Sequence, residues 1–221
     1  MAEARAIKML EMQFGALQSL LCIGAHADDI EVGCGGTVLR LLAEHPDTRV
    51  RWVVLSASGN RAEEAAAGAE RFLGDASAKE IVLKDFRDSF FPYERAEVKE
   101  FLHDLASEIS PDLIFTHRRE DLHQDHRAVS ELTWCAFRDH MILEYEIPKY
   151  DGDLGSPNVF VPLSERICSQ KVDSVVDVFQ SQHEKRWFTK DTFRSTLRLR
   201  GVECNSHSGY AEGFTCRKLT L

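Results

Sequence analysis

Two short segments of the chain are dense in histidine and aspartate, and each comes soon after an apolar run. The first is His26-Ala27-Asp28-Asp29, and the second is Asp121-Leu122-His123-Gln124-Asp125-His126. Imidazole and carboxylate groups are suitable ligands for a catalytic zinc ion, which usually takes three protein ligands and keeps a fourth position open. His26 and Asp29 can supply two of these ligands, and either His123 or His126 can supply the third.

One carboxylate, Asp28, is left over when this ligand set is complete. A free carboxylate beside a metal-activated water is a candidate general base, and a protein that only binds a ligand does not need one. The alternative interpretation is that Asp28 and Asp29 cap a helix and that the second segment is a solvated turn. That interpretation fits one segment alone better than both together, so the pair favours an enzyme with a metal centre.

The elements that must position these residues alternate between strand and helix. Short apolar runs predict strands, and amphipathic or Ala/Glu-rich stretches predict the helices that follow them. The predicted strands are 19–25, 50–58, 80–86 and 112–117, and the predicted helices are 37–42, 61–74, 93–109 and roughly 125–139. Four such units predict an α/β fold, a Rossmann-like domain with a mostly parallel sheet flanked by helices. Ligands bind at the carboxyl ends of such strands, which is where both segments fall.

The last third of the chain continues the same domain. Extended pieces at 142–148, 158–164 and 214–221, with helices at about 165–182 and 189–200, are expected to add strands and helices to the sheet. The sequence contains no linker, repeat or low-complexity stretch. Residues 1–221 are therefore predicted to form a single domain.

Composition narrows the class of protein. The 221 residues include 27 basic and 36 acidic side chains, a net charge of −9, which argues against a nucleic acid as partner. No run of 18 apolar residues is present, so no membrane span is expected, and the apolar stretch 16–25 is interpreted as a buried strand rather than a signal peptide. Six cysteines without a C-x-x-C pair are expected to be reduced thiols, which predicts a cytoplasmic location. The oligomeric state stays open, a homo-oligomer included.

The segments AHADDIEVGCGGT and PDLIFTHRREDLHQDH resemble the two boxes of the LmbE-like, or PIG-L, family of N-acetylglucosaminyl deacetylases. The similarity extends to R-x-x-E at Arg61 and Glu64, to Ser181-Gln182, and to the segment from Gly209 to Glu212. The resemblance implies a zinc site formed by His26, Asp29 and His126. It further implies the roles of five other residues: general base for Asp28, oxyanion stabilisation by a protonated His123, orientation of an imidazole by Asp125, and contact with the sugar or its substituent for Arg61 and Asp88.

The activity implied by the resemblance is hydrolysis of an acetamido group on a sugar, nucleotide sugar or glycoconjugate, which releases acetate and a free amine. The alternatives are a metal-dependent hydrolase of another amide or ester, and a ligand-binding protein with a relic metal site. Zn²⁺ is the implied ion, although two histidines and an aspartate also suit Fe²⁺.

The chain departs from the family pattern at three positions. Ala27 and Gln124 replace prolines, which predicts looser loops, and Ile30 replaces a glutamate, with Glu31 one place on. A polar contact near the metal is therefore expected to be missing or shifted. The glycines around Cys34, in Gly33-Cys34-Gly35-Gly36, are interpreted as a site of close packing rather than a phosphate loop, with Cys34 a packed thiol. His207, beside Tyr210 and Glu212, is interpreted either as lining the mouth of the site or as a plain loop residue.

Overall fold

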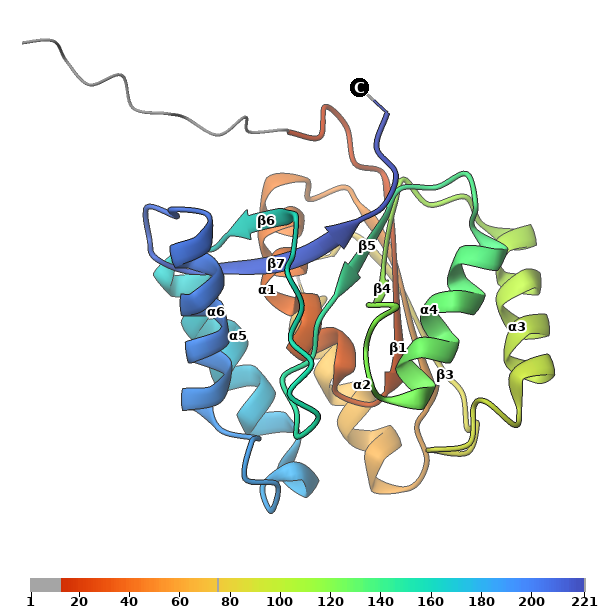
Figure 1. Cartoon of the computed structure of the whole chain (residues 1–221). Helices are drawn as coiled ribbons and strands as arrows, with labels where there is room; N and C mark the ends of the chain where they lie inside the picture. The colour runs from red at the N-terminus through yellow and green to blue at the C-terminus, as the bar shows by residue number, and fades with distance from the viewer. Residues whose placement is uncertain (1–12, 75, 221) are drawn as a thin grey trace, which may run out of the picture.

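The computed structural model describes residues 13–74 and 76–220, and its centre is a seven-stranded sheet (Figure 1). The strand order is β3-β2-β1-β4-β5-β7-β6. The first five strands in that order run parallel, whereas β7 pairs antiparallel with both β5 and β6. The strands are β1 Ser19–His26, β2 Arg49–Ser56, β3 Ala78–Leu83, β4 Leu113–His117, β5 Ile142–Tyr145, β6 Val159–Pro162 and β7 Ala211–Cys216.

Helices cover both faces of the sheet, which confirms the predicted fold class. The helices α3 and α4 pack together on one face, while α1, α2 and α5 cover the other, and α6 packs on α5 and β7 (Figure 1). A 3₁₀ turn, Gln180–Gln182, follows α5. The helices are α1 Asp29–Glu44, α2 Asn60–Phe72, α3 Arg95–Glu108, α4 Gln124–Ala136, α5 Glu165–Val178 and α6 Lys190–Glu203.

The central strands are apolar on both faces because helices bury both. Along β1, Leu20 and Cys22 belong to the core beneath α1, α2 and α5, whereas Leu21 and Ile23 belong to the core beneath α3 and α4. This alternation within a continuous apolar run is typical of a parallel strand. The interpretation of the stretch before His26 as a buried strand is thus confirmed.

The glycine-rich segment lies inside a helix, which corrects the predicted helix start at residue 37. The helix α1 begins at Asp29, so Gly33 to Gly36 occupy its second turn. A Cβ on Gly33 would lie 2.2 Å from the ring of Tyr145, and one on Gly35 would lie 2.5 Å from the ring of Phe72. The low helix propensity of glycine is therefore offset by closer helix–sheet packing, as the close-packing interpretation predicted.

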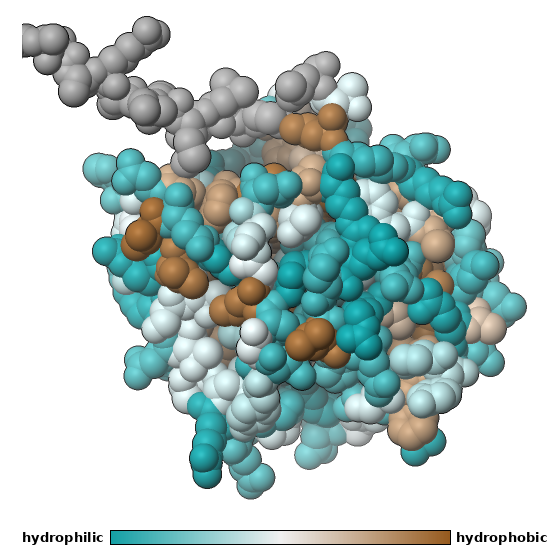
Figure 2. Space-filling model, in the orientation of Figure 1, coloured by the Kyte–Doolittle hydropathy of each residue, from teal (hydrophilic) through white to brown (hydrophobic). Residues whose placement is uncertain are grey.

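The prediction that the six cysteines are unpaired thiols agrees with the structure. All six cysteines are free, and Cys34 is buried, with its thiol against the carbonyl of Ile30. No helix among the described residues is long and apolar enough to cross a membrane. The face in Figure 2 is mostly hydrophilic, and its apolar side chains form small separate patches. Such scattered exposure is ordinary for a folded domain.

Candidate active site

The two polar segments meet at the carboxyl ends of β1 and β4, the lower edge of the sheet in Figure 1. His26 is the last residue of β1, and Asp29 opens α1 directly after it. His123 is the N-cap of α4, and His126 lies in the first turn of that helix. The strand neighbours β1 and β4 thus bring together residues about 100 positions apart in the chain.

His26, Asp29 and His126 converge on one point. The Nδ1 atom of His26 lies 3.2 Å from Nε2 of His126, and the carboxylate of Asp29 lies 3.4 Å from the former and 3.5 Å from the latter. Ligand atoms around a tetrahedral ion with bonds of about 2.0–2.1 Å stand roughly 3.3 Å apart. Each pair of side chains therefore has roughly the spacing of metal ligands, although Asp29 turns a different oxygen toward each imidazole.

The outer nitrogens of both imidazoles face carboxylates. His26 Nε2 lies 3.2 Å from Asp125 and 3.2 Å from Asp88, and His126 Nδ1 lies 3.0 Å from Asp121. A carboxylate accepts the N–H, so the inner nitrogens, His26 Nδ1 and His126 Nε2, carry lone pairs. Two lone pairs and the Asp29 carboxylate facing one another repel unless a proton on His26 Nδ1 or a metal cation lies between them. This donor set fits a divalent metal ion.

Charge and burial set the protonation of the three candidate ligands. Burial lowers the pKa of His26, but its hydrogen bonds to Asp125, Asp29 and Asp88 outweigh burial and raise that pKa well above its usual range, so a metal ion would have to displace the proton on Nδ1. Burial, followed by the charge of His117, lowers the pKa of His126 to about 3, so that imidazole is neutral. Burial alone would raise the pKa of Asp29, but the imidazoles of His126 and His117 outweigh it and hold the pKa well below its usual range. The backbone N–H of His26 also donates to Asp29, at 2.6 Å. A neutral imidazole and an ionised carboxylate are the forms that bind metal.

Asp125 is held in place by the loop between β3 and α3. Its carboxylate accepts N–H groups from Ser89, at 2.6 Å, and from Phe91, at 3.2 Å. Ser89 adopts a φ of 66°, a left-handed conformation that is uncommon outside glycine and aims its N–H at Asp125. Gln124 donates from Nε2 to the Ser89 carbonyl at 2.5 Å. The glutamine thus ties the two loops together, against the expectation that losing a proline there loosens them.

Asp28 lies at the N-cap of α1, yet its side chain makes no capping hydrogen bond. The capping interpretation of Asp28 is therefore wrong for this residue. Its carboxylate is buried and lies 3.1 Å from Nη2 of Arg61. Burial raises the pKa of Asp28, whereas the charge of Arg61 acts in the opposite direction. Asp28 is thus a buried carboxylate next to the three candidate ligand residues. Among the described residues, its one ion-pair partner is Arg61.

Arg61 is itself positioned by the other family-like motifs. Its Nη1 lies 2.9 Å from Glu64, and Glu64 accepts hydrogen bonds from the N–H and the hydroxyl of Ser181, at 2.8 and 2.6 Å. The guanidinium lies over the ring of Phe179, 5.6 Å from its centroid. The helix-face pair with Glu64 is thus present, and it directs Arg61 toward Asp28 instead of leaving it in solvent.

His123 and Asp88 border the three candidate ligand residues. His123 Nδ1 accepts the N–H of Asp125 at 3.3 Å, which leaves its Nε2 to carry the proton of the neutral ring. Burial and the charge of His26 lower the pKa of His123, which favours that neutral form over the protonated one expected from the sequence. The Asp88 side chain is 69% exposed while one oxygen reaches His26, so Asp88 is open to solvent at the edge of the site.

Sequence reasoning assigned no role to two buried residues of the site. His117, the last residue of β4, accepts the N–H of Ala25 at Nε2, at 2.9 Å, so that nitrogen is not free to bind metal. Asp121 is buried and accepts from both His126 and the N–H of His123. The sequence could have indicated both residues, because His117 lies at the end of a predicted strand and Asp121 belongs to the second polar segment.

Other polar residues named from the sequence have structural contacts. Both carboxyl oxygens of Glu31 are buried against Gly68 of α2 without a hydrogen-bond partner in the described part of the chain, and burial raises the pKa of Glu31 well above its ordinary range. Glu31 therefore does not take the place of the missing glutamate near the ligands. Glu212 accepts the N–H groups of Gly36 and Thr37, about 10 Å along α1 from its start.

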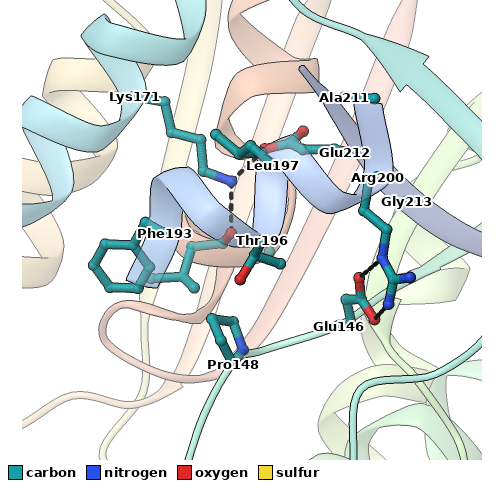
Figure 3. Close-up of a pocket in the computed structure, with 12 residues that line it drawn as sticks. Glu146, Pro148, Lys171, Phe193, Thr196, Leu197, Arg200, Ala211, Glu212 and Gly213 are labelled. Carbon is teal, nitrogen blue, oxygen red and sulfur yellow. Dashed lines mark hydrogen bonds and ion pairs between the residues drawn. The ribbon is translucent and has the colours of Figure 1, made fainter. Parts of the chain in front are cut away.

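The cavity beside Glu212 is too small for a substrate. Figure 3 shows Lys171 pointing to Glu212 and Arg200 forked onto Glu146 around this space of about 20 Å³. That volume holds about one water molecule. A larger groove of about 420 Å³ lies at the amino ends of β1, β2 and β3, opposite the histidines. In this class of fold ligands bind at the carboxyl ends, where His26 and His126 lie.

Comparison with known proteins supports the fold and the motifs. A curated relative, described as the uncharacterized deacetylase YaiS of Escherichia coli (strain K12), is 29% identical over 167 residues, which cover 70% of this chain and 87% of that protein. The N,N′-diacetylchitobiose deacetylase of Pyrococcus horikoshii superposes with a TM-score of 0.66 at 20% identity, covering 91% of this chain and 84% of that one.

A second similar structure is described with a different activity. The 4-carboxy-2-hydroxymuconate hydratase of Pseudomonas putida KT2440 superposes with a TM-score of 0.74 at 17% identity, covering 93% of this chain and 98% of that one. At these identities the structures establish a shared fold, on which more than one chemistry occurs. The sequence profile described as PIG-L, GlcNAc-PI de-N-acetylase, matches residues 21–137. Because this match spans more than half of the chain and includes His26, Asp29 and His126, the protein belongs to the PIG-L (LmbE-like) family.

Proposed function

We propose that the protein is a metal-dependent N-deacetylase that removes the acetyl group from an acetamido substituent of a sugar or sugar conjugate. The observation that carries this proposal is the convergence of His26, Asp29 and His126. Beside them lies the carboxylate of Asp28, which makes no helix-capping hydrogen bond. Membership of a family described as de-N-acetylases supports the reaction class. A relative and a structure of the same fold are described as deacetylases, one of them for a diacetylated sugar.

The three ligand residues would hold one divalent ion, for which Zn²⁺ is the first choice and Fe²⁺ the second. Bound there, the ion would polarise the amide carbonyl and make a water molecule more acidic. Asp125 and Asp121 lie against the outer nitrogens of the two imidazoles and orient the rings, so the inner nitrogens would be left to bind the ion.

The other residues move protons and bind the substrate. Asp28 takes a proton from the attacking water, and its raised pKa makes it a stronger base than an exposed aspartate. His123 donates from Nε2 to the oxyanion, which a neutral ring can do as well as a protonated one. The proton held by Asp28 then passes to the leaving nitrogen, which departs as an amine. Asp88 and Arg61 lie at the edge of the site and contact the sugar or its substituent.

A substrate panel tests this function. Metal-loaded protein is incubated with N-acetylated sugars, nucleotide sugars and glycoconjugates, with an O-acetyl ester, and with an unsaturated hydroxy acid as a hydratase probe. Release of primary amine and acetate in equal amounts is expected with at least one N-acetyl substrate. Turnover of the ester or hydration of the acid alone would replace the proposed reaction, and binding without turnover would indicate a relic site.

Removing Arg61 is expected to shift the pH dependence of the reaction. Asp28 acts as a base only when ionised, and Arg61 lowers its pKa against the effect of burial. In Arg61→Met the pKa of Asp28 rises, so activity is lost at a higher pH as the solution is acidified. The measurement is the acidic limb of kcat/KM against pH, compared between variants because other groups share that limb.

The matched control for Arg61 is Arg71→Met, on the same helix, where the guanidinium pairs with Asp177 at the surface. That variant should keep the wild-type profile, since exposed pairs contribute little. If Arg61→Met lowers kcat/KM equally at every pH, Arg61 acts only as a substrate contact. A KM that rises more for anionic than for neutral N-acetyl sugars would identify that contact as one with a charged substituent.

A further inference from the structure

The loop between β5 and β6 reaches the candidate metal site through a buried lysine. Lys149 lies 3.0 Å from Asp121, and its ammonium group donates to both carboxylate oxygens of Asp153, at 2.7 and 2.6 Å. The three side chains are 7%, 2% and 6% exposed, respectively. Three charged groups are thus buried together directly behind a ligand residue.

This cluster is continuous with His126. One oxygen of Asp121 lies 3.0 Å from Nδ1 of His126, and the other takes both the N–H of His123, at 2.8 Å, and the ammonium group of Lys149. Asp153 in turn accepts the N–H of Leu122, at 2.7 Å. The lysine therefore fixes both the carboxylate behind His126 and the segment that leads into α4.

Stability alone does not account for a buried cluster of this kind. Removing charged groups from water costs free energy that their mutual attraction often fails to recover, so apolar side chains would serve the fold as well. A carboxylate behind a ligating imidazole, in contrast, selects the tautomer and fixes the ring. Asp121 can do this only if its carboxylate is held. Among the described residues Lys149 is the lysine or arginine in contact with that carboxylate, whereas Arg127 donates to the backbone carbonyl of Asp121.

The two ends of this loop, near Glu146 and Gly155, are anchored by a different residue. Arg200 of α6 donates to Glu146, at 2.6 and 2.8 Å, and to the carbonyl of Gly155, at 3.0 Å. Figure 3 shows the fork of Arg200 on Glu146. The base of the loop is thus fixed without Lys149, so replacing Lys149 should disturb the contact with Asp121 while the loop stays attached to the domain.

We infer that Lys149 is a positioning residue for the metal site, which holds Asp121 against His126 so that Nε2 of that imidazole presents its lone pair to the ion. This inference rests on the proposed metal site. The lysine touches neither the ion nor the substrate. It acts through one carboxylate on one ligand, so its loss should weaken metal binding and not only turnover.

The test measures Zn²⁺ affinity of the full-length protein by competition with a chromogenic chelator. Lys149→Met keeps the apolar stem and removes the charge, and it is expected to bind Zn²⁺ about 10- to 100-fold more weakly, as for other groups that orient a ligand. Lys149→Arg restores the charge and should recover part of the affinity. Ring ¹⁵N shifts of metal-free protein give a second readout, with His126 changing from one dominant tautomer to a mixture in Lys149→Met.

Two lysines supply matched controls. Lys171→Met removes an equally buried lysine, paired with Glu212 beside the middle of α1, and Lys190→Met removes an exposed lysine paired with Asp173. Both should keep the wild-type Zn²⁺ affinity and the wild-type His126 tautomer. If Lys171→Met weakens binding as much as Lys149→Met does, the effect is one of general stability and the inference is wrong.

The milder variant Asp153→Asn covers the case in which Lys149→Met does not fold. It removes the charge that holds the lysine while an amide oxygen can still accept from Leu122, and a weakening of a few-fold is expected. Wild-type protein that binds no divalent ion would overturn the metal site and this inference together. Wild-type binding with unchanged affinity and tautomer in the Lys149 and Asp153 variants would overturn the inference alone.

Discussion

Purified His26→Ala protein is expected to contain no divalent ion and to show no turnover, whereas the wild-type chain carries about one ion. His26 Nδ1 faces His126 and Asp29 at 3.2 and 3.4 Å, so its loss removes one of the three converging donor groups. Asp29→Ala and His126→Ala should behave in the same way. Elemental analysis after gel filtration measures the metal, and release of amine measures turnover.

The control for these variants is His103→Ala, an exposed histidine of α3 that should leave both metal content and activity unchanged. Circular dichroism separates loss of metal from loss of the fold. Metal retained at the wild-type level in all three ligand variants would show that the site lies elsewhere. His123 would then be the first residue to replace, because it forms another group of ligand type with His26 and His126.

Asp28→Asn is expected to keep the metal and lose activity by roughly 10²-fold or more, as for other general bases. The amide keeps the size of the side chain and cannot accept a proton. Because Asp28 contacts Arg61 and not the converging ligand atoms, zinc affinity should change little. The measurement pairs kcat with metal content in one preparation, and Asp173→Asn, an exposed aspartate paired with Lys190, is the control.

His123→Ala extends the same test to the oxyanion. It should also keep the metal and lower kcat, because its Nε2–H is expected to act on the transition state. Loss of metal in either Asp28→Asn or His123→Ala, with activity restored by added Zn²⁺, would mean that the roles of ligand and catalyst had been exchanged. His123 lies close enough to His26 and His126 for that exchange to be geometrically possible.

The location of the candidate site could be predicted from the sequence because it depends on local patterns. Hydrophobic periodicity and composition predicted the strands β1 and β4. Because ligands bind at the carboxyl ends of parallel strands, we could expect His26 and His126 at the same edge of the sheet. Helix α1 was predicted to start too late because glycines lower helix propensity locally. The loss of helix propensity is offset by close packing of Gly33 against Tyr145 and of Gly35 against Phe72, which are distant in the chain.

Only the tertiary structure decided which neighbours each side chain contacts. Sequence spacing left His123 and His126 as equal candidates for the third ligand. In the structure, Nδ1 of His123 accepts the backbone N–H of Asp125, whereas Nδ1 of His126 faces the carboxylate of Asp121. Lys149 follows His126 by 23 positions in an irregular loop, where no periodicity reports which way a side chain points. Its contact with Asp121 depends on the path of that loop across the sheet edge. Such paths are set by packing between distant segments, and a pattern of neighbouring residues does not encode them.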